Sequence, residues 1–150
     1  MDLIAWSENL TAEKAKAGGA ALVSRQDLFR QADFLSIHLQ LSPRTRGLVT
    51  GKDLALMKPT AFIINTSRGP IIDEPSLMAA LGSRKLGGAG LDVFDVEPLP
   101  INHPLRKLDN VVLTPHLGYV SQEGYKVYYT QMVEAIKAWL AGAPVRVIKK

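Results

Sequence analysis

The sequence predicts an α/β fold in which helices cover both faces of a parallel β-sheet. Strand-like and helix-like segments alternate along the 150 residues, and the connections between them are short. Short apolar runs cover residues 60–64, 89–94 and 111–113. Such runs are typical of parallel strands that are buried on both sides. Because no internal repeat and no linker-like segment interrupts the pattern, we expect a single domain over residues 1–150.

The elements of the first half follow from apolar runs and capping residues. In chain order, they are expected at residues 3–6 (strand), 11–17 (helix), 20–23 (strand), 24–32 (helix), 34–39 (strand) and 52–57 (helix). Thr11 and Ser24 begin the first two helices, where a side-chain hydroxyl can accept a hydrogen bond from the first turn. Gly18 and Gly19 end the first helix, and Pro59 stops the third.

The elements of the second half are expected at residues 60–64 (strand), 73–81 (helix), 86–94 (strand), 111–113 (strand) and 121–141 (helix). Asp73 caps the helix that it begins, and Gly82 ends that helix. Gly87, Gly88 and Gly90 loosen their strand and allow backbone or ligand to approach closely. In the last helix, aromatic and aliphatic residues recur every three or four positions, which we interpret as core packing.

The composition is that of an ordinary globular protein, with 47% apolar and 21% charged residues. No apolar run reaches the length of a membrane span, and the first residues do not resemble a signal peptide. Cysteine is absent, so thiolate sites are excluded, and we expect no metal site. The net charge of +4 is scattered, which disfavours nucleic-acid binding. We therefore expect a cytoplasmic protein without nucleic-acid or membrane partners.

An ionisable residue follows each of the three apolar runs: Arg68, Glu97 and His116. In open α/β sheets, ligands bind outside the carboxyl ends of the strands, so these side chains can meet in one cleft. A guanidinium there can bind a carboxylate through two hydrogen bonds. An imidazole that a carboxylate orients can act as a general acid or base. Each residue alone is more often structural, but the combination favours catalysis.

Two further residues are candidates for the same cleft. Asp92 lies inside an apolar run, and a buried carboxylate requires a partner or a function. His38 ends a predicted strand, although a structural role for it is about as common. His103, which precedes Pro104, is expected in a loop.

The motifs around these residues resemble those of one enzyme family. They are residues 36–39 (SIHL), 45–48 (TRGL), 65–73 (NTSRGPIID), 90–94 (GLDVF) with Glu97-Pro98, and 114–118 (TPHLG). In this order and spacing, nearly the whole chain is similar to the nucleotide-binding domain of the D-isomer-specific 2-hydroxyacid dehydrogenases. That family includes phosphoglycerate, glyoxylate/hydroxypyruvate and D-lactate dehydrogenases. The resemblance implies a Rossmann-like fold.

The resemblance also implies roles for individual residues. Arg68 would bind the substrate carboxylate and carbonyl, His116 would exchange a proton with the 2-oxygen, and Glu97 would orient His116. Asp92 would hold the nicotinamide carboxamide. The residues implied to line the dinucleotide are His38, Leu39, Thr66, Ser67, Arg68, Asp92, His116 and Gly118. The substrate would be a small 2-oxo or 2-hydroxy acid, and the parent enzyme would be a homodimer.

The chain departs from the family pattern in two respects. It contains no Gly-x-Gly-x-x-Gly turn, and residues 1–6 resemble the second strand of the family domain. We therefore expect the first strand, the Gly-rich turn, the first helix and the substrate domain to be missing. The second departure is Ser7, followed by Glu8, at the end of that strand, where NAD enzymes usually have an acid. We expect NAD as the cofactor, with NADP possible.

The leading hypothesis is an NAD(P)-dependent oxidoreductase of D-2-hydroxy acids and 2-oxo acids, present as a truncated chain with little activity by itself. The alternative is a non-catalytic dimerisation or interaction module, because a missing sheet centre would expose apolar strand edges. An anion- or nucleotide-binding module is less favoured, since the phosphate-binding turn that it would need is absent.

Overall fold

The computed structural model describes residues 1–148, so the last two residues of the predicted domain 1–150 lie outside the described residues. The chain divides into two compact units, the first comprising Met1–His116 and the second beginning at Leu117. The single domain expected from the sequence stays a prediction.

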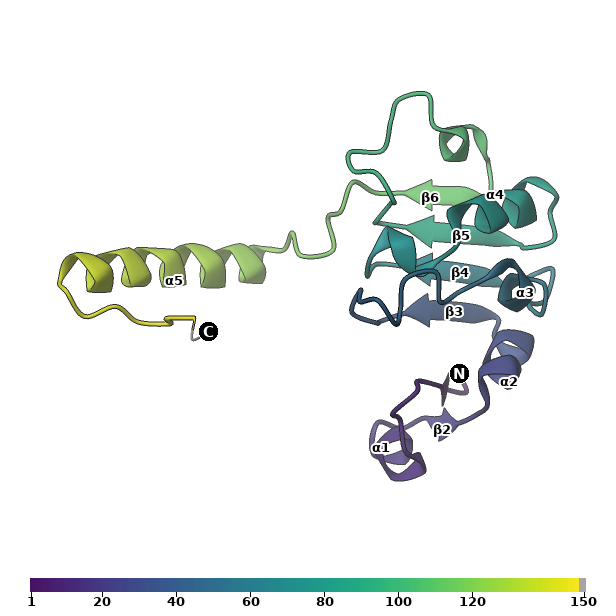
Figure 1. Cartoon of the computed structure of the whole chain (residues 1–150), viewed down its shortest axis with the longest axis horizontal. Helices are drawn as coiled ribbons and strands as arrows, with labels where there is room; N and C mark the ends of the chain where they lie inside the picture. Colours follow the sequence, from purple (N-terminus) through teal and green to yellow (C-terminus); the bar gives the residue numbers. More distant parts are fainter. Residues whose placement is uncertain (149–150) are drawn as a thin grey trace. The chain divides into compact units, whose positions relative to one another are not determined.

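The first unit contains a four-stranded parallel sheet, as the sequence predicts. Its strands are β3 (Phe34–Ile37), β4 (Phe62–Asn65), β5 (Gly88–Leu91) and β6 (Val111–Leu113), in the spatial order β3-β4-β5-β6. Figure 1 shows these four strands side by side with their arrowheads pointing the same way. Strands β1 (Ile4–Ala5) and β2 (Ala21–Leu22) form a separate parallel pair. The predicted fold class, a Rossmann-like parallel sheet flanked by helices, is confirmed.

The first unit contains four α-helices, and three of them begin directly after a predicted capping residue, whereas the helix expected at residues 52–57 covers residues 51–54 instead. The four helices are α1 (Ala12–Ala17), α2 (Arg25–Gln31), α3 (Gly51–Leu54) and α4 (Glu74–Gly82). The side chains of Thr11, Ser24 and Asp73 each accept a hydrogen bond from the first turn of their helix. Gly82 is the last residue of α4 rather than its stop, and Ser83 is the C-cap. Two 3₁₀ turns, η1 (Gly69–Ile71) and η2 (Pro104–Lys107), were not predicted.

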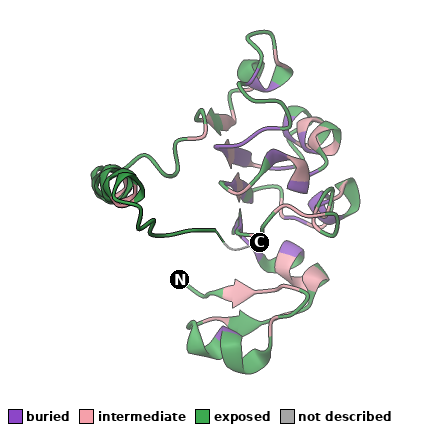
Figure 2. Ribbon diagram, turned by 60° about the vertical axis from the view of Figure 1, so that its left-hand side comes forward, coloured by how far each residue is buried: buried purple, intermediate pink, exposed green. Residues whose placement is uncertain are grey.

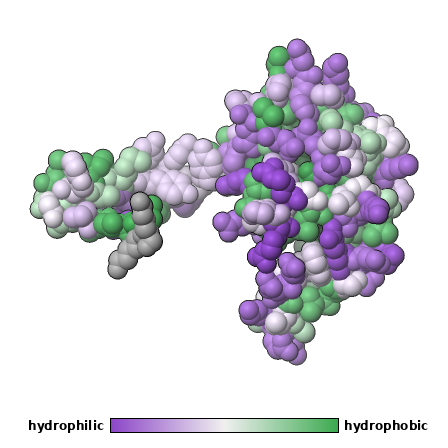
Figure 3. All heavy atoms as spheres, in the orientation of Figure 1, coloured by the Kyte–Doolittle hydropathy of each residue, from purple (hydrophilic) through white to green (hydrophobic). Residues whose placement is uncertain are grey.

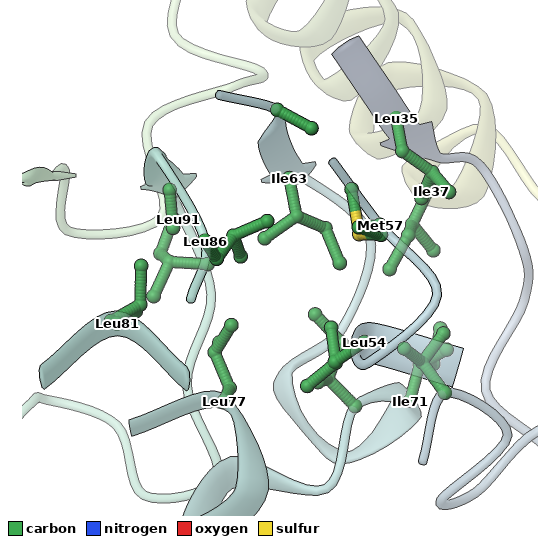
Figure 4. Packing of buried hydrophobic residues seen from close by; sticks show 14 of the residues in the cluster. Leu35, Ile37, Leu54, Met57, Ile63, Ile71, Leu77, Leu81, Leu86 and Leu91 are labelled. Carbon is green, nitrogen blue, oxygen red and sulfur yellow. The ribbon is translucent and has the colours of Figure 1, made fainter. Parts of the chain in front are cut away.

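The hydrophobic core lies between one face of the sheet and the helices α3 and α4. Figure 4 shows Leu54 of α3 and Leu77 of α4 opposite residues of the sheet that include Ile63 and Leu91. All four of these side chains are buried, and Ile63 has no exposed surface. Burial of each such side chain contributes roughly 1.5–3 kcal/mol, so this layer holds the carboxyl ends of the strands in fixed positions.

The opposite face of the sheet is open, and here one prediction is wrong. Phe34 and Phe62 stack with ring centroids 5.5 Å apart, yet they remain 68% and 39% exposed. Val112, on the same face of β6, is 69% exposed. Residues 60–64 were expected to be buried on both sides. The described residues of the first unit cover only one side of this strand. The side chain of Phe62, which points to the other side, is therefore left partly exposed.

The glycines at the start of β5 and just before it allow close approach of backbone, as the sequence predicts. A Cβ atom added at Gly87 would lie 2.8 Å from the carbonyl carbon of Thr60, and one at Gly88 would lie 2.6 Å from the carbonyl oxygen of Asn110. Both contacts are shorter than real Cβ contacts. Glycine at these positions therefore allows the strand and its neighbours to pack closely.

The second unit contains α5 (Gln122–Leu140), which begins after its N-cap Ser121. Within this unit its aromatic residues form no core, so their predicted core packing stays a prediction. Tyr129 is 61% exposed and Trp139 is 68% exposed. Figure 2 shows α5 almost entirely as exposed residues, and apolar atoms appear on its visible surface in Figure 3. A periodic apolar stripe predicts a helix, but it does not identify what packs against the stripe. Among the described residues, no helix is both long enough and apolar enough to cross a membrane.

An ion pair between Arg25 and Asp53 connects α2 with α3. The guanidinium donates to both carboxylate oxygens, with Nε–Oδ1 and Nη2–Oδ2 distances of 3.1 Å and 2.8 Å. It also donates to the carbonyl oxygen of Leu48. Burial would raise the pKa of Asp53, but hydrogen bonds from Thr50 and the charge and hydrogen bond of Arg25 lower it overall.

We predict that Asp53→Asn lowers the free energy of unfolding by about 1.5–3 kcal/mol at neutral pH, because a charge-assisted network is lost. Since the pKa of Asp53 is lowered in the folded state, its contribution is complete above the ordinary carboxyl pKa. It is lost as the pH falls through the folded-state pKa. Urea denaturation of both proteins across acidic and neutral pH measures this difference.

The exposed pair between Lys58 and Asp33 provides the matched control. Its Nζ–Oδ1 distance is 2.7 Å, but the two side chains are 41% and 72% exposed. Lys58→Met is expected to cost less than about 1 kcal/mol. Equal losses in the two variants, or a loss in Asp53→Asn that does not change with pH, would contradict the prediction.

Candidate active site at the carboxyl edge of the sheet

The strand register places the predicted site residues in one row. Ile37, Asn65, Leu91 and Leu113 are paired across the sheet from β3 to β6. The residues that follow them are His38, Thr66, Asp92 and Thr114. Because the strands are parallel, this row forms the carboxyl edge of the sheet, where ligands of open α/β sheets bind. The sequence predicted three of the four residues in the row.

Asn65 shapes the loop that carries the candidate arginine. Its side chain is buried, and its amide Nδ2 donates to the carbonyl oxygen of Arg68 at 2.9 Å. Its Oδ1 accepts from the backbone N–H of Ser67 at 3.0 Å. The Ser67 hydroxyl donates to the carbonyl oxygen of Ile37 at 2.9 Å, which joins the ends of β3 and β4. Sequence reasoning missed Asn65, although a polar residue at the end of an apolar run was a signal.

Arg68 lies in an exposed turn directly after this loop. Its Nη1 donates to the carbonyl oxygen of Ser67 at 2.6 Å. The next residue, Gly69, is buried at the start of η1. The positive charge of Arg68 also contributes to lowering the pKa of Glu97. The arginine therefore lies near enough to act electrostatically on the predicted catalytic carboxylate.

Glu97 and His116 form a direct hydrogen bond, as the sequence predicts. The distance from His116 Nδ1 to Glu97 Oε2 is 2.7 Å. The other oxygen, Oε1, accepts from the backbone N–H of Phe94 at 2.9 Å. A carboxylate can only accept, so Nδ1 carries a proton and Nε2 is the ring nitrogen oriented for exchange with a substrate. His116 has a φ of 59°, a left-handed conformation that non-glycine residues seldom adopt outside functional sites and turns.

The hydrogen bonds of Glu97 keep it in its charged form. Burial would raise the pKa of Glu97, but the hydrogen bond from His116 and that from Phe94 lower it, as do the charges of His116 and Arg68. The net result is a pKa below the ordinary glutamate value. The pair with His116 therefore persists as the pH falls and is lost only when the pH drops through this lowered pKa.

Asp92 is buried at the end of β5, next to the loop that contains His116. The hydroxyl of Thr114 donates to its Oδ1, and its backbone N–H donates to the carbonyl oxygen of Asn65 at 3.0 Å. Its side chain is thus fixed at the centre of the row of strand ends. The predicted need for a partner of this buried carboxylate is confirmed by Thr114.

A hollow of about 500 Å³ opens beside the Glu97–His116 pair. It is lined by Phe94, Glu97, Pro98, Leu99, Arg106, Leu113, Thr114, Pro115 and His116. Sequence reasoning missed Arg106, whose Nε and Nη2 donate to the carbonyl oxygens of Pro100 and Leu99 at 3.0 Å and 2.8 Å. Arg106 thereby holds the loop that carries Glu97. No sequence motif indicated this role, because it depends on the folded path of the loop.

The remaining predicted residues are placed less closely around the pair. His38 Nε2 lies 2.8 Å from the hydroxyl oxygen of Ser36, and its side chain is exposed. Leu39 is partly buried and packs against the core. Thr66 is exposed at the end of β4. Gly118 belongs to the second unit, so its predicted place beside a cofactor stays a prediction.

The carboxyl edge is suited to the nicotinamide part of a dinucleotide. The buried Asp92 offers a fixed acceptor for a carboxamide, close in the row to the loop of His116. Thr66 and Ser67 lie one strand away, and His38 and Leu39 two strands away. A pyrophosphate normally binds at a glycine-rich turn before a helix. The 150 residues contain no Gly-x-Gly-x-x-Gly turn.

Comparisons with known proteins agree with this geometry. Residues 1–118 match the sequence model of the D-isomer specific 2-hydroxyacid dehydrogenase NAD binding domain. A D-3-phosphoglycerate dehydrogenase from Synechocystis sp. is 43% identical over 146 residues, which are 97% of this chain and 26% of that protein. A glyoxylate reductase from Aeropyrum pernix is 45% identical over 123 residues, which are 82% of this chain and 37% of that protein.

The match extends to three-dimensional structure. A solved chain from Ralstonia solanacearum, described as a candidate D-3-phosphoglycerate dehydrogenase oxidoreductase, superposes with a TM-score of 0.91 at 38% identity. The match covers 98% of this chain and 43% of that one. The chain thus spans about a quarter to two fifths of the length of the proteins that it matches.

Proposed function

The chain belongs to the D-isomer specific 2-hydroxyacid dehydrogenases, in which it matches the NAD-binding domain, and on this premise we propose that it supplies the cofactor-binding and proton-transfer part of an NAD-dependent oxidoreductase. The substrate would be a small D-2-hydroxy acid or the corresponding 2-oxo acid. The observation that carries the proposal is the 2.7 Å hydrogen bond between His116 and Glu97 at the carboxyl edge of the sheet.

His116 is proposed to move the proton. When bound, the nicotinamide cofactor supplies or accepts the hydride at the 2-carbon of the substrate. During reduction, His116 Nε2 would donate a proton to the 2-oxygen, and during oxidation it would take that proton back. Glu97 holds Nδ1, which fixes the direction of Nε2. Its negative charge also stabilises the imidazolium form that precedes proton donation.

Arg68 is proposed to hold the substrate. A guanidinium can bind a carboxylate through two parallel hydrogen bonds, which orients the acid as well as attracting it. The turn formed by Asn65 and Ser67 brings Arg68 to the carboxyl edge, where its charge acts on Glu97. Together with His116, it would select 2-oxo and 2-hydroxy acids over simple ketones and alcohols.

The 150-residue chain is expected to have little activity by itself. Its sequence contains the residues for proton transfer but not the glycine-rich turn that normally holds the pyrophosphate. The proposed cofactor is NAD, with NADP as the alternative: Glu8 follows β1 and is suited to a ribose hydroxyl, but its Oε2 also lies 3.8 Å from Arg44 Nη1. A homodimeric assembly and a cytoplasmic location are proposed with it, by analogy with the family.

A chimera tests the proposed function directly. In it, this chain replaces the 146 matched residues of the Synechocystis D-3-phosphoglycerate dehydrogenase. We expect the chimera to oxidise D-3-phosphoglycerate with NAD, because the chain provides the proton-transfer residues. The isolated chain should show little turnover with glyoxylate or hydroxypyruvate and NADH. NADH absorbance measures both reactions.

Two results would contradict these expectations. A chimera that folds and binds NADH but gives no turnover would refute the proposed catalytic role. Rapid turnover by the isolated chain, abolished by His116→Ala, would refute its expected inactivity. Thermal melts and NADH titrations of each protein separate a loss of catalysis from a loss of folding.

A second candidate function is a non-catalytic interaction module. It is favoured by edges of β1 and β3 that pair with no strand among residues 1–148 and that lie on either side of a hollow in the first unit.

A further inference from the structure

A side-chain pair joins the two segments that carry the proposed substrate-binding and proton-transfer groups. One segment, residues 68–74, begins at the proposed substrate-binding arginine and enters the first turn of α4. The other, residues 94–103, contains Glu97 and ends at His103, which is the N-cap of η2. The distance from His103 Nε2 to Glu74 Oε1 is 3.2 Å. The pair therefore connects the last residue of each segment.

The same two segments are also in contact near their beginnings. A Cβ atom added at Gly69 would lie 2.1 Å from the carbonyl carbon of Phe94, so the two backbones pack directly against each other. The backbone N–H of Phe94 in turn donates to Glu97 Oε1 at 2.9 Å. The start of the Glu97 loop is therefore fixed next to the turn that contains Arg68.

The hydrogen bonds of His103 at the far end of the loop define its tautomer. Its Nδ1 accepts from the backbone N–H of Leu105 at 3.4 Å, so Nε2 carries the proton and donates to the Glu74 carboxylate. The side chains of His103 and Glu74 are only 17% and 19% exposed, and a hydrogen bond is stronger in such surroundings than in water. Glu74 lies in the first turn of α4, where a negative charge is favoured.

The loop between these two anchors has little support from the core. Of residues 95–102, only Leu99 is buried. The hydrogen bonds of Arg106 to this loop are local, because Arg106 follows its two carbonyl partners by six and seven residues. They shape the loop, but they do not fix where it lies relative to Arg68. The hydrogen bond to Glu74 spans 29 residues of sequence and ties the loop to α4.

We propose that Glu74 and His103 are positioning residues that act through Glu97. Their hydrogen bond keeps the loop on the path that places the Glu97 carboxylate against Nδ1 of His116. Neither residue lines the hollow beside His116, so neither is assigned a contact with the substrate. As far as turnover is concerned, the inference rests on the proposed function, whereas the orientation of the His116 ring does not depend on that function.

Nitrogen NMR of the histidine rings tests the pair in the 150-residue chain. At mildly alkaline pH, where histidine rings are neutral, long-range proton–nitrogen spectra show which ring nitrogen carries the proton. The structure predicts opposite tautomers for two of the three histidines, with the proton on Nε2 in His103 and on Nδ1 in His116. The signal that is lost in His116→Ala belongs to His116. In Glu74→Ala, we expect the His116 signal to change to a mixture of tautomers, because Glu97 no longer stays on Nδ1.

Matched variants separate the loss of this hydrogen bond from a general loss of stability. Glu74→Gln keeps a carbonyl oxygen that can accept from His103 Nε2, so it should affect the His116 tautomer much less than Glu74→Ala does. The double variant Glu74→Ala/His103→Ala should have no larger effect than either single variant. Asp109→Ala is the control, because it removes an exposed ion pair with Arg84 that also connects the region of α4 with the chain beyond η2. It should leave the His116 tautomer unchanged.

Steady-state kinetics of the chimera test the consequence for turnover. Glu74→Ala should lower kcat by about tenfold or more, since misplacement of a catalytic group by about 1 Å can cost about 100-fold. The KM for the substrate should change little, because Arg68 and its turn are retained. Glu74→Gln should recover most of the lost kcat, and Asp109→Ala should match the unmodified chimera. Thermal melts show whether each variant is folded.

Three outcomes would overturn the inference. These are an unchanged His116 tautomer in folded Glu74→Ala, equal effects of Glu74→Ala and Asp109→Ala, or a lower kcat without any change at His116. If His103→Ala does not fold, Glu74→Ala still decides the question, because alanine is well tolerated in a helix. A chimera without turnover would refute the proposed function alone, since the NMR measurement uses the 150-residue chain and involves no hydride transfer.

Discussion

Replacing His116 by alanine in the chimera is expected to lower kcat by about 100- to 10,000-fold, the usual contribution of a positioned general acid or base. The imidazole lies 2.7 Å from the Glu97 carboxylate, so the substitution removes the only group of this pair that can carry the proton to the 2-oxygen. The KM for the substrate should change little, because Arg68 is retained. Steady-state kinetics in both reaction directions measure this separation of kcat from KM.

Glu97→Gln is the matched variant for the same pair. The amide keeps the size of the side chain but removes the negative charge that stabilises the imidazolium form. We expect a smaller loss of kcat than in His116→Ala, with NADH affinity retained. The double variant should be no slower than His116→Ala alone, because Glu97 acts through His116. Independent, multiplicative losses would contradict this positioning role.

Replacing Gly69 by alanine is expected to lower the free energy of unfolding by about 1–3 kcal/mol or more. A Cβ atom there would lie 2.1 Å from the carbonyl carbon of Phe94 and 2.6 Å from the amide nitrogen of Asp95. These are backbone atoms, so the clash cannot be relieved by rotating a side chain. The segment that begins at Phe94 carries Glu97, so the chimera should also lose activity.

Gly82→Ala provides the control for this substitution. Gly82 is the last residue of α4, and a Cβ atom there would have no heavy atom within 4 Å. Alanine at this position should leave stability unchanged or raise it by about 0.4–1 kcal/mol. Denaturant titration of the two variants compares them directly. If Gly69→Ala were as stable as Gly82→Ala, the close approach between the Arg68 loop and the Glu97 loop would be refuted.

The sequence predicted most of the local structure because that structure depends on local chemistry. Thr11, Ser24 and Asp73 cap their helices through their own side chains, and each helix begins where they stand. Strands β3 to β6 coincide with apolar runs of the sequence. Their parallel arrangement is expected because they alternate with helices. The two 3₁₀ turns and the helical position of Gly82 were not predicted, because short turns and helix ends depend on neighbouring contacts.

The sequence predicted those residues of the site that lie at or shortly after the end of a strand. Glu97 and His116 were expected to meet, since each follows the carboxyl end of an apolar run, and the structure places His116 Nδ1 2.7 Å from Glu97 Oε2. Asn65 and Arg106 were missed because their roles consist of hydrogen bonds to backbone atoms of loops. What packs against the apolar face of α5 was not predicted either, since periodicity identifies an apolar face but not its partner.

The sequence by itself determined the fold class, the strand ends that carry ionisable residues, and the family pattern of Arg68, Glu97 and His116. These properties depend on residue identity and spacing along the chain. Only the tertiary structure decided that Nδ1 of His116 is the ring nitrogen that bonds to Glu97, that Gly69 must lack a side chain, and that Arg106 holds the loop of Glu97. Those three facts depend on distances between separate segments of the chain, which are set by the packing of the whole unit.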